Sequence, residues 1–300
     1  MINILSLKEK KTIKIILCFI AFYLILTIFV PLFNLLIKSF YTEEGTFVGV
    51  DNYFSYFTKY GVVESIWHSL IIALSTGFIT TFFAFICAYA LQHSTLKNKK
   101  IIELVISIPL FCPSLLPGLG LIYLFGNQGL IKFLLPYPFY GPFGIIMGEV
   151  FYSFPYAVLI LMTSLSLFDQ RLFDAAYMLR TSKLRIFTSI IWPICKSGLF
   201  KTFLIVFITS LTDFGVPAIV GGNYRVLATD IYQYIIGQYN FSLGSVVAVL
   251  LLLPSLMIFC IDYLFFKKQK ITFMPHAIPY QPKPSMIKNS ILFILSLIPA

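Results

Sequence analysis

Six stretches of this chain consist almost entirely of apolar residues, and each is close to the ~20 residues that a helix needs to cross a bilayer. They cover residues 15–37, 69–91, 101–125, 143–167, 198–222 and 243–266. Hydrophobic residues make up 59% of the chain and the mean hydropathy is +0.90, well beyond the range of soluble domains. We therefore predict an all-α polytopic membrane protein with six transmembrane helices.

The formal net charge of +10 could suggest nucleic acid binding, but the positions of the charges indicate membrane topology instead. Basic residues gather in residues 1–14, 97–100, 168–193 and 267–270, whereas the stretch 39–67 is rich in acidic and aromatic residues. Because cytoplasmic loops carry an excess of Lys and Arg, we expect a cytoplasmic basic N-terminus and external loops after the first, third and fifth spans. The six-span domain is predicted to cover residues 15–267.

The loop 168–193 is the most basic interruption between two apolar runs, and it is too charged to lie in hydrocarbon. Its apolar residues nevertheless recur at helical spacing, which predicts two short amphipathic helices that meet near Thr181 and Ser182. A folded amphipathic loop outside the bilayer needs a partner for its apolar face. We expect that partner to be a protein in the cytoplasm.

The same loop resembles the EAA loop of ABC importer permeases, whose pattern is Glu-Ala-Ala, three residues, Gly, nine residues, Ile, one residue, Leu and Pro. The residues at these positions are Asp174, Ala175, Ala176, Arg180, Ile190, Trp192 and Pro193. The spacing is intact, with Asp in place of the Glu, Arg in place of the Gly and Trp in place of the Leu. The resemblance implies a MetI-like permease core in a bacterial inner membrane, with this loop as the coupling helix that docks on an ABC ATPase subunit. It also implies an extracytoplasmic substrate-binding protein and a second permease half, either fused or from a homodimer. ATP would be used by the partner subunit, and no cofactor would be bound by this chain.

Arg180 is the main departure from the family pattern, because the family has Gly at this position. Glycine would supply the left-handed backbone conformation of an elbow between two helices, and arginine is disfavoured in that conformation. We therefore expect the elbow to be built differently here.

Two acidic residues lie within apolar runs and are candidates for the transport pathway, because an ionisable residue inside a span is a functional hypothesis by default. Asp213 is followed by Gly215 and Pro217, a combination that suggests a helix break lining a cavity; a structural role as a helix cap is equally compatible. Glu149 lies inside the fourth run and is the weaker candidate. The third run contains Pro109, Pro113 and Pro117 and is also expected to be broken or kinked.

The stretch TDFGVPAIVGGNYRVLAT resembles the fifth-span region of the ferric-iron and aminophosphonate type of importer permease. The resemblance implies ferric iron as the substrate, with a phosphonate, a polyamine or thiamine as alternatives. An alternative of another class is an ion-coupled secondary transporter that uses Asp213 or Glu149 as a proton or sodium relay. The two classes differ in whether uptake needs an ATPase or an ion gradient.

Enzymatic and metal-binding functions find no support in the sequence. There is no phosphate-binding GxxxxGK[ST] loop, no HExxH and no GxSxG, so ATP hydrolysis is expected on a separate subunit. His68, His93 and His276 lie in loops or at span ends, and the five cysteines show no CxxC pairing. No metal site is predicted.

Beyond the sixth run, residues 268–288 contain four prolines and are predicted to form a cytoplasmic linker. Residues 289–300 begin a further apolar run that is too short to cross a bilayer. They are expected either to start a second permease repeat, which the family resemblance favours, or to lie at the membrane interface.

Overall fold

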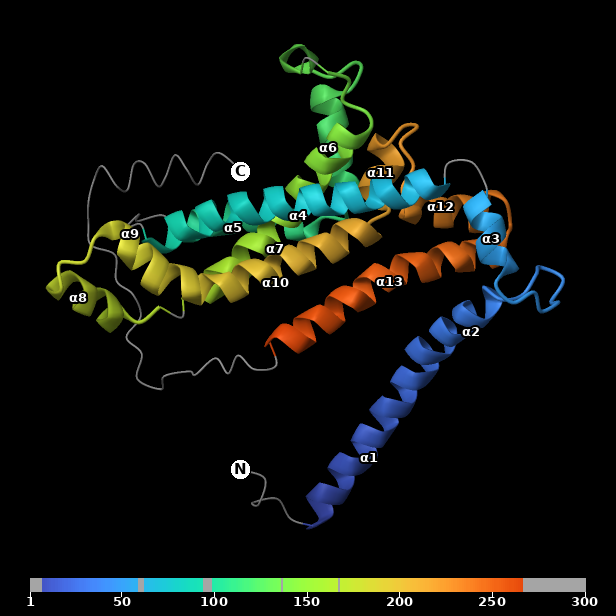
Figure 1. Ribbon diagram of the computed structural model, residues 1–300, viewed down its shortest axis with the longest axis horizontal. Helices are drawn as coiled ribbons and strands as arrows, with labels where there is room; N and C mark the ends of the chain where they lie inside the picture. Colours follow the sequence, from blue (N-terminus) through green and yellow to red (C-terminus); the bar gives the residue numbers. More distant parts are fainter. Residues whose placement is uncertain (1–6, 59–61, 94–98, 136, 167, 267–300) are drawn as a thin grey trace. The chain divides into compact units, whose positions relative to one another are not determined.

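The computed structural model describes residues 7–58, 62–93, 99–135, 137–166 and 168–266 (Figure 1). The longer helices are α1 (Leu7–Leu24), α2 (Val30–Lys38), α3 (Asp51–Thr58), α4 (Val62–His93), α5 (Lys99–Ser107), α6 (Leu115–Phe125), α7 (Pro142–Leu165), α8 (Gln170–Met178), α10 (Trp192–Thr212) and α13 (Phe241–Phe266). The shorter helices are α9 (Lys183–Ile186), α11 (Gly215–Val220) and α12 (Leu227–Tyr232). An isolated β bridge pairs Tyr41 with Phe47.

Five helical segments are long and apolar enough to cross a membrane, and they become six when one bent pair is counted as a single span. The five are Thr12–Lys38, Val62–Gln92, Pro142–Leu165, Lys183–Thr212 and Phe241–Leu264. The bent pair joins Lys99–Phe111 to Leu115–Phe125 at an angle of 104°. The all-helical, polytopic fold is therefore confirmed, and the expected interruption of the proline-rich third run is a sharp bend.

The fifth predicted span has different ends from those expected. Its helix begins at Lys183 and runs through a π-helical turn (Phe187–Ile191) into α10, where Pro193 lies in the first turn. The wide turn lets Trp192 donate its backbone N–H to the Phe187 carbonyl, so the helix continues past a proline that would otherwise break it. The helix then ends at Thr212, and residues 215–220 form the separate helix α11. A similar π turn (Ile25–Phe29) comes just before Pro31 in the first span.

The described part of the chain divides into two compact units. One contains the described residues up to 62 and residues 230–252, and the other contains the described residues of 63–229 and those from 253 to 266. In the first unit, the side chain of Tyr56 from α3 is fully buried and packs edge-on against Tyr234, with ring centroids 5.9 Å apart. The backbone N–H of Ser242 donates to Glu43 Oε1, which joins the two chain segments of this unit.

The second unit contains a bundle in which α4 and α7 run in parallel. Ile72 and Ile145 share one buried cluster, and Thr80 and Ser153 form a hydrogen bond of 3.0 Å further along the two helices. Residue n of α4 thus lies at the level of residue n+73 of α7. Helix α10 packs against α7.

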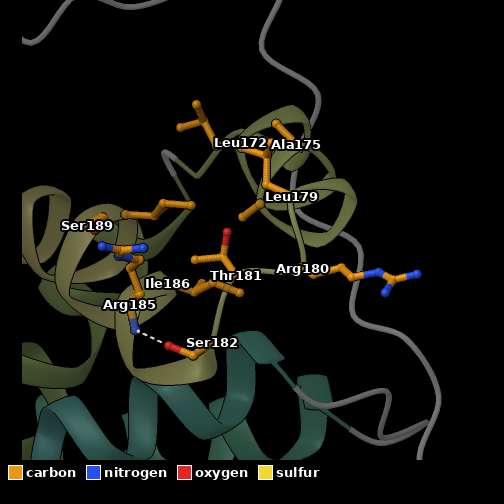
Figure 2. Close-up of a pocket in the computed structure, with 11 residues that line it drawn as sticks. Leu172, Ala175, Leu179, Arg180, Thr181, Ser182, Arg185, Ile186 and Ser189 are labelled. Carbon is orange, nitrogen blue, oxygen red and sulfur yellow. Dashed lines mark hydrogen bonds between the residues drawn. The ribbon is translucent and has the colours of Figure 1, made fainter.

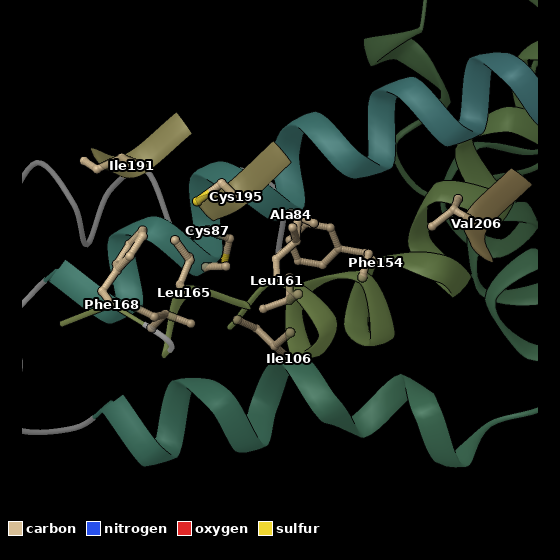
Figure 3. Close-up of a cluster of buried hydrophobic side chains, with 14 of the residues drawn as sticks. Ala84, Cys87, Ile106, Phe154, Leu161, Leu165, Phe168, Ile191, Cys195 and Val206 are labelled. Carbon is tan, nitrogen blue, oxygen red and sulfur yellow. The ribbon is translucent and has the colours of Figure 1, made fainter. Parts of the chain in front are cut away.

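A second cluster of this unit joins α4, α5, α7, α8, α9 and α10 (Figure 3). Many of its residues are small, including Ala84, Ala157 and the cysteines Cys87 and Cys195. Lipid is as apolar as the side chains, so close van der Waals packing through small residues is what favours helix association in a bilayer. The predicted role of these two cysteines as small hydrophobes agrees with their burial. The predicted linker 268–288 and the apolar segment 289–300 lie outside the described residues.

Candidate functional site

The loop between α7 and α10 folds into two helices joined by a tight elbow, as its apolar spacing predicted. Asp169 caps α8 by accepting the backbone N–H of Arg171, and Ser182 caps α9 by accepting that of Arg185 (Figure 2). The chain between them reverses over residues 179–182. A capping side chain therefore sets the start of each helix, and Ser182 is also the last residue of the elbow.

Arg180 adopts a left-handed conformation with φ of +49°. Its N–H donates to the Tyr177 carbonyl and that of Thr181 donates to the Ala176 carbonyl, both over 3.0 Å. This pair of bonds is the usual end of a helix that has glycine in the left-handed position. The expectation of a differently built elbow is therefore wrong: the elbow has the glycine geometry, with an arginine in it. Two backbone hydrogen bonds offset the unfavourable conformation.

Helix α8 has an inner and an outer face. Phe173 and Ala176 are buried in the cluster of the second unit, so they attach the helix to the base of the bundle. On the outer face, Met178 is 86% and Leu179 80% exposed, and Leu184 of α9 is 76% exposed. Exposed apolar side chains beside several charges are unusual on a surface that lies in neither lipid nor a protein core.

The predicted coupling residues take different places in this arrangement. Asp174 is exposed and accepts a hydrogen bond of 2.9 Å from Gln170 Nε2, and Ala175 is exposed, whereas Ala176 is buried. Ile190 is half-buried, and Pro193 is exposed in the first turn of α10. These residues are therefore not one contiguous contact surface.

A groove of about 610 Å³ lies inside the elbow (Figure 2). Its lining is mostly apolar and comes from both helices, with Arg180 at the turn and Arg185 on the second helix. Arg185 was not singled out from the sequence as a site residue. The sequence feature that could have indicated Arg185 is its position one helical turn after Ser182, at the predicted junction of the two helices.

The other predicted site lies at the break between α10 and α11. Asp213 ends α10 with extended backbone, and its Oδ2 accepts the backbone N–H of Val216 over 2.9 Å. The cap that was one of the two interpretations of Asp213 is thus present. Pro217 is buried within α11.

The bend between η3 (Ile108–Phe111) and α6 lies against this break. A Cβ atom placed on Gly215 would meet Ser114 Oγ, and it would approach the backbone nitrogen of Leu115 to 3.0 Å. Only glycine allows the two helix breaks to touch at this point. Both interruptions, predicted separately from Pro and Gly residues, meet in one place.

Glu149 of α7 is 1% exposed and reaches the same break. Its carboxyl group lies near the Asp213 carboxyl and the Ser210 hydroxyl. Nevertheless, Glu149 Oε1 and Ser210 Oγ make no hydrogen bond of good geometry with any described residue. Sequence analysis did not connect Ser210 with the site, although it lies one helical turn before Asp213.

No group of three or more His, Cys, Asp or Glu side chains that could hold a metal ion occurs in the part of the chain that the structure describes. The buried Glu149 carboxyl, the half-buried Asp213 carboxyl and the buried Ser210 hydroxyl thus bring several oxygen atoms close together at the break.

Comparison with known proteins identifies the type of chain. A family model described as binding-protein-dependent transport system inner membrane component matches residues 81–271. Two relatives are named as ferric transport system permease proteins. That of Haemophilus influenzae is 29% identical over 85% of this chain and 42% of its own length, and that of Actinobacillus pleuropneumoniae is 30% identical over 78% and 36%.

Other relatives are named as sulfate, spermidine/putrescine and thiamine transport system permease proteins. Among solved structures, a chain of a bacterial alginate ABC transporter in complex with an alginate-bound periplasmic protein superposes with a TM-score of 0.69. It is 11% identical, and the match covers 89% of this chain and 98% of that one, so it establishes the fold alone. This chain spans about two fifths of the length of the two ferric relatives.

Proposed function

Because this chain belongs to the family of binding-protein-dependent transport system inner membrane components, we propose that it is the transmembrane permease of an ATP-driven ABC importer. It would pass a substrate that an extracytoplasmic binding protein delivers. ATP would be hydrolysed by a separate ABC ATPase subunit in the cytoplasm, and the chain itself would be no enzyme and bind no cofactor.

The exposed apolar face of α8 is the observation that carries this proposal. Met178 and Leu179 are almost fully exposed on a helix held to the bundle by Phe173 and Ala176. Transfer of such side chains from water to a protein interface is favourable by roughly 1.5–3 kcal/mol each. The surrounding charges of Arg171 and Asp174 disfavour lipid as the covering medium, which leaves a protein partner.

The groove beside this face supports docking by a partner with acidic and apolar side chains. Its apolar lining lies beside Arg185, which can pair with a carboxylate. We propose that six residues of this loop couple the permease to the ATPase: Asp174, Ala175, Ala176, Arg180, Ile190 and Pro193. Because Ala176 is buried, it would contribute by holding α8 against the bundle and not by touching the partner.

Ferric iron is the substrate that we propose, because two of the matched relatives are named as ferric transport permeases. A phosphonate, a polyamine or thiamine is the alternative. Glu149, Asp213, Gly215 and Pro217 would line or shape the substrate pathway. The functional unit would contain a second permease half, fused or from a second copy, since the ferric relatives are more than twice as long as their matched parts.

We further propose that the N-terminus faces the cytoplasm of a bacterial cell, in its inner membrane. The basic residues of the N-terminal segment and of the α7–α10 loop would then lie on the same side, as the positive-inside rule requires.

Affinity purification from native membranes in mild detergent tests the docking surface. Leu179→Glu places a charge on the proposed interface, and Leu130→Glu is the matched control because both leucines are 80% exposed. We expect an ABC ATPase subunit to copurify with the wild type and with Leu130→Glu, and to be lost with Leu179→Glu. Recovery of the ATPase with Leu179→Glu would contradict docking on α8.

An ion-coupled secondary transporter is the alternative class, and the carboxyl groups of Glu149 and Asp213 inside the bundle are the observation in its favour. Uptake by membrane vesicles distinguishes the two. An importer needs ATP on the cytoplasmic side and works after the ion gradient is dissipated, whereas a secondary transporter shows the reverse. Ferric iron, a phosphonate, spermidine and thiamine would be compared as substrates in the same vesicles.

A further inference from the structure

The surroundings of Glu149 contain several buried oxygen atoms and no compensating positive charge. The Glu149 side chain is 1% exposed, and its carboxyl group lies near the Asp213 carboxyl. Close packing of the adjacent residues supports this approach independently: a Cβ atom on Gly148 would lie 2.6 Å from Cγ1 of Val216, the residue whose N–H binds Asp213. Helix α7 therefore touches the break between α10 and α11 at this level.

Further buried hydroxyl groups lie at the same level. Ser210 is 5% exposed, and its Oγ has no hydrogen-bond partner of good geometry among the described residues. The same holds for Thr76 Oγ1 of α4, which the parallel register of α4 and α7 places at the level of Glu149. Buried polar groups without partners usually mark a proton, a water molecule or an ion that completes the site.

The described elements around the pair place no positive charge beside it. In α4 the nearest basic residue to Thr76 is His68, eight residues earlier and therefore about 12 Å along the helix. Helices α6, α7 and α11 contain no Lys, Arg or His. In α10 the nearest basic residue is Lys201, twelve residues before Asp213 and therefore about 18 Å along the helix at 1.5 Å per residue. The other titratable side chains near the pair are Tyr152 and Tyr156 of α7, which are uncharged when protonated.

A fully buried carboxylate that lies beside a second carboxyl group and has no positive charge to balance it is strongly disfavoured, so we expect the buried group, Glu149, to bind a proton. A protonated carboxyl group is a hydrogen-bond donor, and Asp213 provides an acceptor because only its Oδ2 is engaged by Val216. We propose that Glu149 and Asp213 form a proton-binding site, in which one proton on Glu149 is shared with Asp213 and joins α7 to the break between α10 and α11. Loss of this proton would place two negative charges in contact and separate the two elements.

This proton site does not depend on the proposed transport function, because it concerns the charge state of the folded protein. Its direct signature is the infrared C=O stretching band of a protonated carboxylic acid, which differs from the bands of a carboxylate. The full-length protein, purified in detergent at about neutral pH, would be compared with Glu149→Gln. Glutamine has the same shape and keeps a donor for Asp213, so the variant is expected to fold.

We expect the wild type to show one such band at neutral pH and Glu149→Gln to lack it. Glu64→Gln, which alters an exposed carboxyl group, is the control and should keep the band. Asp213→Asn provides a second test, because asparagine can still cap α11: the band should persist with a shifted frequency, since its acceptor has changed. Absence of the band from the wild type, or its persistence unchanged in Glu149→Gln, would overturn the proposal. So would a requirement for sodium or another metal cation to keep the wild type folded at neutral pH.

Discussion

The amide of Thr181 donates to the carbonyl of Ala176 over 3.0 Å, across an elbow whose central residue is an arginine in the left-handed conformation. Ala176 takes part in two ways, since its carbonyl closes the elbow and its side chain is buried against the bundle. The direction of the chain after α8 is therefore tied directly to the core of the second unit. A force applied to the outer face of α8 would be transmitted to the bundle through this residue.

Replacing Arg180 by glycine should stabilise the elbow slightly. A residue with a side chain costs the folded state about 1–2 kcal/mol in the left-handed region. Glycine removes that cost, but its greater freedom stabilises the unfolded chain by roughly 0.4–1 kcal/mol. We expect a net gain of about 0.5–1 kcal/mol in the free energy of unfolding, measured by thermal unfolding in detergent. Arg171→Gly, inside α8, is the control and should lose about 1 kcal/mol. A loss of stability in Arg180→Gly would show that the arginine side chain holds the elbow.

The two neighbouring alanines should respond differently to glutamate. Ala176→Glu buries a charge without a partner in the cluster of the second unit, so α8 should detach from the bundle. Ala175→Glu alters an exposed position and should leave the elbow folded while it weakens docking of a partner. Limited proteolysis between residues 168 and 193 measures the difference, with faster cleavage expected only in Ala176→Glu. Equal cleavage of both variants would contradict the assignment of an inner and an outer face.

Much of this architecture could be predicted from local patterns in the sequence. Apolar length identified the spans, and the spacing of apolar residues in 168–193 identified the two helices and their junction. Arg180 shows the limit of such reasoning, because propensity argued against a left-handed arginine and two backbone hydrogen bonds overrode that preference. The start of the fifth helix was misplaced for a related reason, since the π turn before Pro193 has no clear sequence signal.

The site at the break was only partly predictable. Asp213, Gly215 and Pro217 are neighbours, so their sequence indicated a break and a cap. The contact between Asp213 and Glu149 depends on how α7 packs against α10 and α11, and the contact of Gly215 with Ser114 depends on the fold of a distant bend. No local pattern carries that information.

Gly215→Ala should separate the two helix breaks. The added methyl group would meet Ser114 Oγ and the Leu115 backbone nitrogen, and overpacking of this kind costs about 1–3 kcal/mol. We expect a lower unfolding temperature and reduced transport, both partly restored by the double variant Gly215→Ala, Ser114→Gly. Gly120→Ala is the matched control, because no atom lies within 4 Å of its added Cβ. Equal effects of Gly215→Ala and Gly120→Ala would show that the contact of Gly215 with Ser114 and Leu115 does not cause the loss of stability.

Tyr56 should make the first unit sensitive to alkaline pH. Burial, followed by the negative charge of Asp230, raises the pKa of Tyr56 above its ordinary value of 10.0. The folded state therefore keeps this proton when the unfolded chain has lost it, and stability present at or below about pH 10 falls as pH rises further, by about 1.4 kcal/mol per pH unit. Unfolding measured at about pH 9 and pH 11 should show a steeper loss in the wild type than in Tyr56→Phe. Identical slopes would exclude this tyrosine as the cause.

Asp213 should reveal its two roles through two substitutions. Asp213→Asn keeps an acceptor for the Val216 N–H, whereas Asp213→Ala removes it and should cost about 0.5–2 kcal/mol of stability, as loss of a helix cap does. If Asp213 also serves the substrate pathway, Asp213→Asn should change transport kinetics while its unfolding temperature stays near that of the wild type. Uptake assays and thermal unfolding on the same preparations separate these effects. Wild-type kinetics in Asp213→Asn, together with destabilised Asp213→Ala, would limit Asp213 to its role as a cap.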